Sequence, residues 1–335
     1  MDATTADALL EAAQETRVAM RSRDDAAVER VERLYPDIRA AMEWYLEHGR
    51  VDQADRLATA LVPFWMATKR VDDGLAWFDR AIPAPGIDPH RARAEYDHGY
   101  LAFFAGRYGL ADVRFSDARR MASESGDGNV VALALAGSAR VALNTDPAEA
   151  VRMLREAMEV TRDLPDSEGR SSANHVLGVA LQMAGDLEGA REIMSERIER
   201  ARDAGNDFVV AVESANLSMV ERQLGHLDAA EALSLEGLRI VGRKGDEMAI
   251  PWVVNGLAAV TAAQGRLERA ATLIGIAESL LARAGGEWPA DEREQYEGAL
   301  ALAAAGLSRE ALARARATGA SMSVKDGVDF ALASE

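Results

Sequence analysis

The chain has 335 residues, a formal net charge of −17 and no cysteine, and 66 of its residues are alanine. The lack of cysteine excludes disulfide frameworks, thiol nucleophiles and cysteine-rich zinc sites. Aromatic residues make up only 5% of the chain, and a composition so rich in Ala, Leu, Glu and Arg favours helices throughout. DNA binding requires clustered positive charge, so we expect no direct contact between this chain and nucleic acid.

The first residues show no basic segment before an apolar one, and no apolar stretch reaches the roughly 20 residues that a membrane span requires. We therefore expect a cytoplasmic protein with no membrane contact. Residues 1–34 are expected to be a charged helical lead-in from an upstream domain. Residues 35–83 are expected to hold the N-terminal helices of a repeat region, over about 36–48, 51–68 and 71–83. Pro63 predicts a kink or break in the second of these helices.

The segment from Pro83 to His90 contains three prolines and a glycine, so residues 84–90 are predicted to be a linker. Beyond it, turn residues recur at positions 106, 145, 185, 225 and 265, at intervals of 39, 40, 40 and 40. Glycine at a turn tolerates the positive φ of a helix C-cap. The alanine five positions later lets two helices approach closely, as at Ala111, Ala190 and Ala230.

This period predicts an all-α fold, a right-handed superhelical solenoid of helical hairpins with a repeat of about 40 residues. The solenoid is expected to cover residues 91–335 and to end in shorter capping helices. Tighter turns at Gly49 and Lys69 extend the pattern into the N-terminal part, where Ala54 and Gly74 are the small crossing residues.

Two stretches of the chain resemble a known family. The first runs Arg39-Ala40-Ala41-Met42-Glu43-Trp44, then Gly49, Ala54, Phe64-Trp65, Gly74 and Trp77-Phe78; the second runs Gly286-Glu287-Trp288, then Tyr296-Glu297 and Met322-Ser323-Val324. They are similar to the tetratricopeptide (TPR) sensor region of large bacterial transcriptional regulators, which join a signal-transduction NTPase of the STAND class to a LuxR-type helix-turn-helix domain. The resemblance implies a sensor that receives an inducer or a protein partner. No phosphate-binding loop or basic helix-turn-helix segment is present in the chain.

A binding face is predicted from the repeat, because the first helix of each hairpin lines the concave side of such solenoids. The positions expected to face a protein partner, a peptide or a small organic effector are Arg93, Tyr96, Tyr100, Phe103, His175, Gln182, Met219, Arg222, Trp252 and Asn255. Aromatic and Met side chains with a few polar groups suit such ligands. No lysine falls on this face, so phosphates and acidic peptide ends are not expected there.

The alternatives are a scaffold that holds a helix or an extended peptide, and, from another class, an enzyme or a protein that sequesters a small molecule. Tyr100 and Phe103 also fit simple packing between helices. No catalytic, metal-binding or cofactor-binding residue can be named, because the five histidines show no metal-ligand spacing and no serine lies in a nucleophile elbow. We therefore expect a non-enzymatic binding or sensing module without a cofactor.

Overall fold

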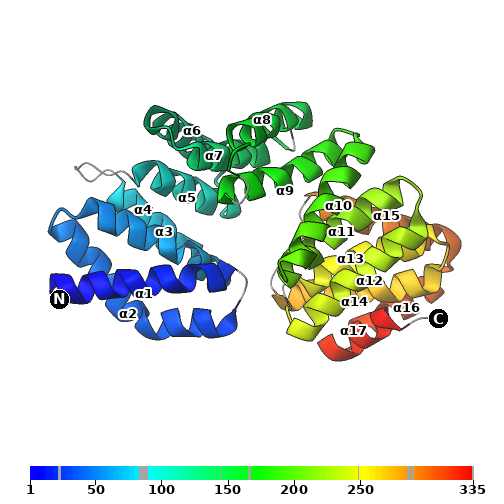
Figure 1. Ribbon diagram of the computed structural model, residues 1–335. Coiled ribbons are helices and arrows are strands. Elements are labelled where there is room, and N and C mark those ends of the chain that lie inside the picture. Colours follow the sequence, from blue (N-terminus) through cyan, green and yellow to red (C-terminus); the bar gives the residue numbers. More distant parts are fainter. Residues whose placement is uncertain are drawn as a thin grey trace. The chain divides into compact units, whose positions relative to one another are not determined.

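The computed structural model describes residues 1–21, 24–82, 90–143, 145–164, 167–247, 249–284, 288 and 290–333. All regular secondary structure in these ranges is helical (Figure 1), which confirms the predicted fold class. The chain divides into two compact units, Met1–Ala184 and Gly185–Glu335. None of the described helices is long and apolar enough to cross a bilayer.

The first unit consists of helices stacked as antiparallel neighbours. They are α1 (Ala3–Arg21), α2 (Asp25–Glu47), α3 (Val51–Ala67), α4 (Val71–Ala81), α5 (Arg91–Phe104), α6 (Tyr108–Ser125), α7 (Gly128–Ala142), α8 (Pro147–Val160) and α9 (Glu168–Met183). The odd-numbered helices pack against one another in chain order, and each even-numbered helix from α2 to α8 packs against the odd-numbered helices before and after it. This two-layer arrangement is the one that stacked helical hairpins form.

The second unit continues the series and closes it differently. Its helices are α10 (Leu187–Asp203), α11 (Asp207–Gln223), α12 (Leu227–Lys244), α13 (Ile250–Ala263), α14 (Leu267–Ala284), α15 (Ala290–Gly306), α16 (Arg309–Ala320) and α17 (Val324–Leu332). α11, α13 and α15 pack in order, as the odd-numbered helices of the first unit do. α16 packs mainly on α14, and α17 packs on α12, α13 and α14.

Left-handed residues end the helices where the repeat predicts turns. Gly106, Gly185, Gly225 and Gly265 have φ values of +72°, +85°, +86° and +79°, a conformation that glycine adopts without a Cβ penalty. Lys69 also has a positive φ, of 59°. The predicted turn near residue 145 uses another device, because the Asp146 side chain accepts a hydrogen bond from the Glu149 amide and caps α8.

The small residues predicted at helix crossings are buried as expected. Every one of the alanines at these positions has no exposed surface: Ala54, Ala111, Ala150, Ala190, Ala230 and Ala270. A Cβ added to Gly74 would lie 2.6 Å from Leu101 Cδ1 and 2.6 Å from Trp65 Cε3. A larger side chain at these positions would force neighbouring helices apart.

The N-terminal helices belong to the same core as those that follow them. One apolar cluster extends from Ala6 and Leu10 of α1 through Trp65 and Phe115 to Ala134 of α7. α2 begins at Asp25 and continues through Pro36, and α3 is continuous through Pro63. Of the kink or break predicted at Pro63, the break is therefore wrong and the kink stays a prediction. The predicted linker at 84–90 lies outside the described residues except for His90. The division of the chain at residues 34, 83 and 90 stays a prediction.

Arginines form many of the links between helices. Arg91 donates to Asp55 at 2.8 Å, and Arg197 donates to Glu213 at 2.7 Å, with both carboxylates almost fully buried. The sequence pattern predicts solvent-exposed helix faces with pairs four residues apart, and such pairs exist, as between Arg120 and Glu124. Pairs between helices are common as well, so the charged residues contribute to packing.

Candidate ligand-binding face

Side chains from α1, α5, α7 and α9 converge on one side of the first unit. We call this surface the arginine–tyrosine face. It consists of Arg17, Arg21, Arg93, Tyr96, Asp97, Tyr100, Arg140, Glu168 and Ser172. All four helices belong to the odd-numbered layer of the first unit.

Glu168, at the start of α9, is the centre of an ion-pair cluster on this face. Arg93 Nη1 and Nη2 donate to the two carboxylate oxygens at 3.0 Å each. Arg21 Nη1 lies 2.9 Å from Glu168 Oε1, and Arg17 Nη1 lies 3.5 Å from Oε2. Arg93 Nε also donates to Asp97 at 2.9 Å. α1, α5 and α9 are therefore joined by charge-assisted hydrogen bonds.

Burial and neighbouring charges act on this cluster in opposite directions. Burial raises the pKa of Glu168, but Arg93, followed by Arg21 and Arg17, outweighs it and lowers that pKa to about 2. Burial lowers the pKa of Arg93, and the charges of Asp97 and Glu168 raise it above its ordinary value. The pKa of Arg17 is lowered, first by burial and then by the charge of Arg93. Glu168 and Arg93 are therefore both ionised at neutral pH.

Aromatic rings continue the face along α5. The ring centroids of Tyr96 and Tyr100 are 6.0 Å apart, and those of Tyr100 and Phe104 are 4.8 Å apart. Tyr96 is buried, whereas half of Phe104 is exposed. Arg93 lies over the Tyr96 ring. The row of rings therefore begins in the core and ends at the surface, so its members serve packing at one end and offer a contact surface at the other.

The structure brings together the four site residues predicted on α5. Arg93, Tyr96, Tyr100 and Phe103 line one stripe of that helix, with Arg93 in the Glu168 cluster and Phe103 packed against the core. His175 and Gln182 are half-buried on α9, further along the helix than Glu168 and Ser172.

The predicted residues of the second unit have different environments. Trp252 is 39% exposed on α13, whereas Met219 of α11 is buried. Arg222 has a buried Nε that forms no hydrogen bond with the described part of the chain, and its pKa is lowered by burial, which the charge of Glu294 opposes. Asn255 is fully buried and donates to the Glu292 carbonyl oxygen at 3.0 Å and to its carboxylate at 2.8 Å. Asn255 therefore links α13 to the start of α15.

Sequence reasoning missed several residues of the arginine–tyrosine face. Glu168 precedes the predicted His175 by seven positions, two helical turns, so extending the predicted stripe of α9 toward its start would have found it. Arg140 and the two arginines of α1 carry no comparable signal, because their positions depend on how successive hairpins are rotated. These three arginines also place positive charge on this face. The expectation that phosphates and acidic peptide ends do not bind there was based only on the absence of lysine.

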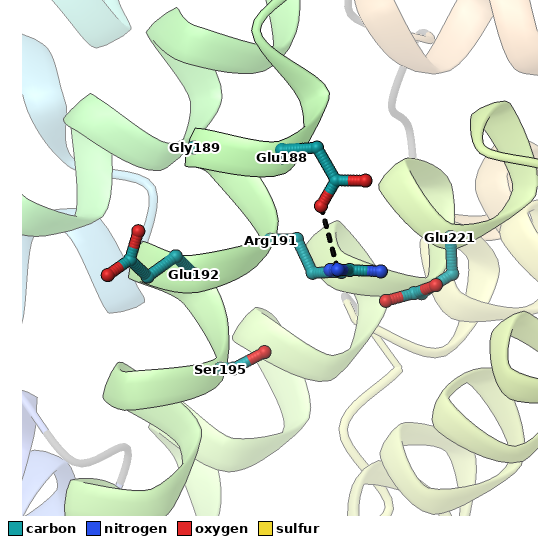
Figure 2. Close-up of a pocket in the computed structure, with 6 residues that line it drawn as sticks. All are labelled: Glu188, Gly189, Arg191, Glu192, Ser195 and Glu221. Carbon is teal, nitrogen blue, oxygen red and sulfur yellow. Dashed lines mark ion pairs between the residues drawn. The ribbon is translucent and has the colours of Figure 1, made fainter.

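A separate polar hollow of about 620 Å³ lies in the second unit. It is lined by Glu188, Gly189, Arg191, Glu192, Ser195 and Glu221 (Figure 2). Arg191 pairs with Glu188 at 2.7 Å, and Glu221 accepts a hydrogen bond from His226 Nδ1 at 2.7 Å. None of the sequence-predicted site residues lines this hollow. Among the described residues, no group of three or more His, Asp or Glu side chains is arranged to hold a metal ion.

No protein-family model matches the chain. In sequence it is 27% identical over 219 residues to proteins named HTH-type transcriptional regulators from Mycobacterium tuberculosis and Mycobacterium bovis. The match covers 62% of this chain and 25% of each regulator. The chain therefore spans about a quarter of the length of the curated relatives it matches.

Solved structures resemble the chain over most of its length. The apo form of the quorum sensor NprR from Bacillus thuringiensis matches with a TM-score of 0.58 at 17% identity, covering 92% of this chain and 83% of that chain. The STAND protein PH0952 from Pyrococcus horikoshii has a tetratricopeptide repeat sensor. It matches with a TM-score of 0.59 at 13% identity, covering 94% of this chain and 51% of that chain. The fold is tetratricopeptide-like. This TPR-like fold confirms the architecture that the family resemblance implies.

Proposed function

We propose that this chain is the non-catalytic sensing module of an HTH-type transcriptional regulator and that it binds a peptide or small organic effector. The observation that carries the proposal is the arginine–tyrosine face. It presents rings of graded exposure, from Tyr96 to Phe104, beside the guanidinium groups of Arg93 and Arg140. Apolar surface with a few directed polar groups is the usual composition of a ligand site.

The similar proteins support this role. NprR has also been solved in complex with its cognate peptide NprX, and that structure matches with a TM-score of 0.56 at 17% identity, covering 90% of this chain and 81% of that chain. The related sequences are named transcriptional regulators. With a net charge of −17, we propose that this chain senses the signal in the cytoplasm and that another part of the regulator contacts DNA.

The sensing mechanism we propose is differential binding. Ion pairs of the face join α1, α5 and α9, and Arg140 adds α7. A ligand held between these helices favours the arrangement that it fits best, and it shifts the equilibrium by no more than its preference between the arrangements. The curvature of the first unit would thereby report whether the ligand is present.

The test is retention of peptides from a pool of random hexapeptides, measured by gel filtration followed by mass spectrometry of the bound fraction. We expect the wild-type protein to retain a subset of sequences and Tyr100→Ala to lose them. Val113→Ala, which alters an exposed residue of α6, is the matched control and should retain the same subset. Trp252→Ala tests the second unit in the same way.

If the wild-type protein retains no peptide from the pool, the proposed peptide sensing is wrong, and if Tyr100→Ala retains the wild-type subset, the arginine–tyrosine face is not the sensing face. The first of these results, together with capture of an intact regulator domain, would support the scaffold alternative. Circular dichroism of each variant shows whether lost binding reflects lost folding.

A further inference from the structure

Among the described residues, Arg140 is the arginine of the arginine–tyrosine face that has no carboxylate partner. Its Nη1 and Nη2 both donate to the Ser172 hydroxyl at 3.3 Å, and its guanidinium lies 6.0 Å from the centroid of the Tyr100 ring. No carboxylate pairs with it among the described residues. A half-buried guanidinium that is bonded only to a neutral hydroxyl keeps most of its affinity for an anion.

The surrounding charges favour an anionic group at this point. The face carries four arginines, Arg17, Arg21, Arg93 and Arg140, against the two carboxylates Asp97 and Glu168. Glu168 is already shared among three of these arginines. Arg17 Nε is buried and has no hydrogen-bond partner among the described residues, so this face also holds an unused donor.

The position of Arg140 joins this charge to the aromatic surface. Tyr100, which lies beneath the guanidinium, contacts Phe104, and the exposed end of the ring row begins there. A ligand whose anionic group reaches Arg140 would therefore have its apolar part on these rings. Because the other three arginines already share Glu168, one monoanionic group is enough to pair with Arg140.

We propose that Arg140 and Ser172 bind a carboxylate group of the ligand, either the C-terminal carboxylate of a peptide or an acidic side chain, while Tyr100 and Phe104 contact its apolar part. This inference rests on the proposed sensing function and names the chemistry of the ligand. The planar guanidinium fork matches a carboxylate through two parallel hydrogen bonds.

The experiment uses three hexapeptide pools with the intact chain. The first has free C-terminal carboxylates and no Asp or Glu, the second has the same sequences with C-terminal amides, and the third has C-terminal amides with Asp and Glu included. We expect retention from the first or the third pool to exceed the second by roughly tenfold, the effect of one charge-assisted hydrogen bond pair. Whichever pool is retained identifies the source of the carboxylate.

Variants assign the effect to Arg140. Arg140→Gln should lower retention by roughly tenfold, Arg140→Lys should lose part of it, and Ser172→Ala should weaken it. Arg119→Gln is the matched control, because Arg119 pairs with Glu156 on an exposed part of α6. Millimolar inorganic phosphate is added as a competitor in a parallel experiment.

Three results would overturn the carboxylate site: equal retention of all pools, unchanged retention by Arg140→Gln, or displacement of the bound peptides by phosphate. If Arg140→Gln binds like the wild type while Tyr100→Ala does not, the sensing face stands and only the carboxylate site fails. If the wild type retains nothing from any pool, both proposals fail together.

Discussion

Arg93 and Glu168 are 75 residues apart in the chain, yet two hydrogen bonds of 3.0 Å join the guanidinium fork of one to the carboxylate of the other. Both side chains are largely buried, with exposed fractions of 14% and 20%. Because Arg17 and Arg21 reach the same carboxylate, this pair is the point at which the first helix of the chain is tied to the ninth.

Breaking this pair should destabilise the first unit. We expect Arg93→Leu to lower the free energy of unfolding by about 2–4 kcal/mol, because it leaves Asp97 and Glu168 with less compensating charge in a buried setting. Urea denaturation measures the change. The double variant Arg93→Leu/Glu168→Leu should lose less unfolding free energy than the two single variants lose in total. The exposed pair of Arg119 and Glu156 is the control, and its Arg119→Leu variant should change stability by about 0–1 kcal/mol.

The stabilisation from Glu168 should disappear in acid. Its pKa in the folded protein is about 2, below the ordinary value of 4.5, so its contribution is complete above pH 4.5 and is lost as the pH falls toward 2. The difference in unfolding free energy between the wild type and Glu168→Gln should therefore be constant at higher pH and shrink below pH 4.5. A difference that does not change with pH would contradict the low pKa.

His98 should produce a separate pH dependence. It is fully buried against Phe78, and although Asp79 Oδ1 lies 3.4 Å from its Nε2, neither ring nitrogen forms a hydrogen bond with a described residue. Burial, with a further effect of Arg114, lowers its pKa from 6.5 to about 4. As the pH falls, His98 therefore takes up a proton in the unfolded chain before it does so in the folded chain. The free energy of unfolding decreases as the pH drops from 6.5 to 4. We expect His98→Leu to reduce this slope in urea titrations. An unchanged slope would show that other groups cause it.

The crossing of α14 and α16 in the second unit should not tolerate a larger residue. A Cβ on Gly319 would overlap the Thr272 carbonyl oxygen, and one on Gly275 would overlap that of Arg316. We expect Gly319→Ala to lower the unfolding free energy by about 1–3 kcal/mol, because backbone atoms must move apart. In contrast, a Cβ on Gly298 of α15 meets nothing within 4 Å, so Gly298→Ala should stabilise the protein by about 0.5–1 kcal/mol. Thermal melting distinguishes the two outcomes.

The repeat and its local geometry could be predicted from the sequence, because they depend on short-range features. A left-handed glycine at Gly185 or Gly225 and a buried alanine five positions later are requirements of each helical hairpin taken alone. Helical periodicity likewise placed Arg93, Tyr96 and Tyr100 on one stripe of α5.

Only the tertiary structure decided which of these residues meet residues from elsewhere in the chain. The contact of Arg17 with Glu168 spans 151 positions. It depends on the rotation between successive hairpins, which accumulates over five odd-numbered helices. This rotation does not change the spacing of turn residues along the sequence, so the sequence pattern does not reveal it. The same reason explains the burial of Asn255. Helical periodicity assigns this residue to an open face, but α15 covers it and Glu292 accepts its hydrogen bonds. The sequence by itself determined the repeating unit, and the stacking of the units determined where charge and aromatic surface come together.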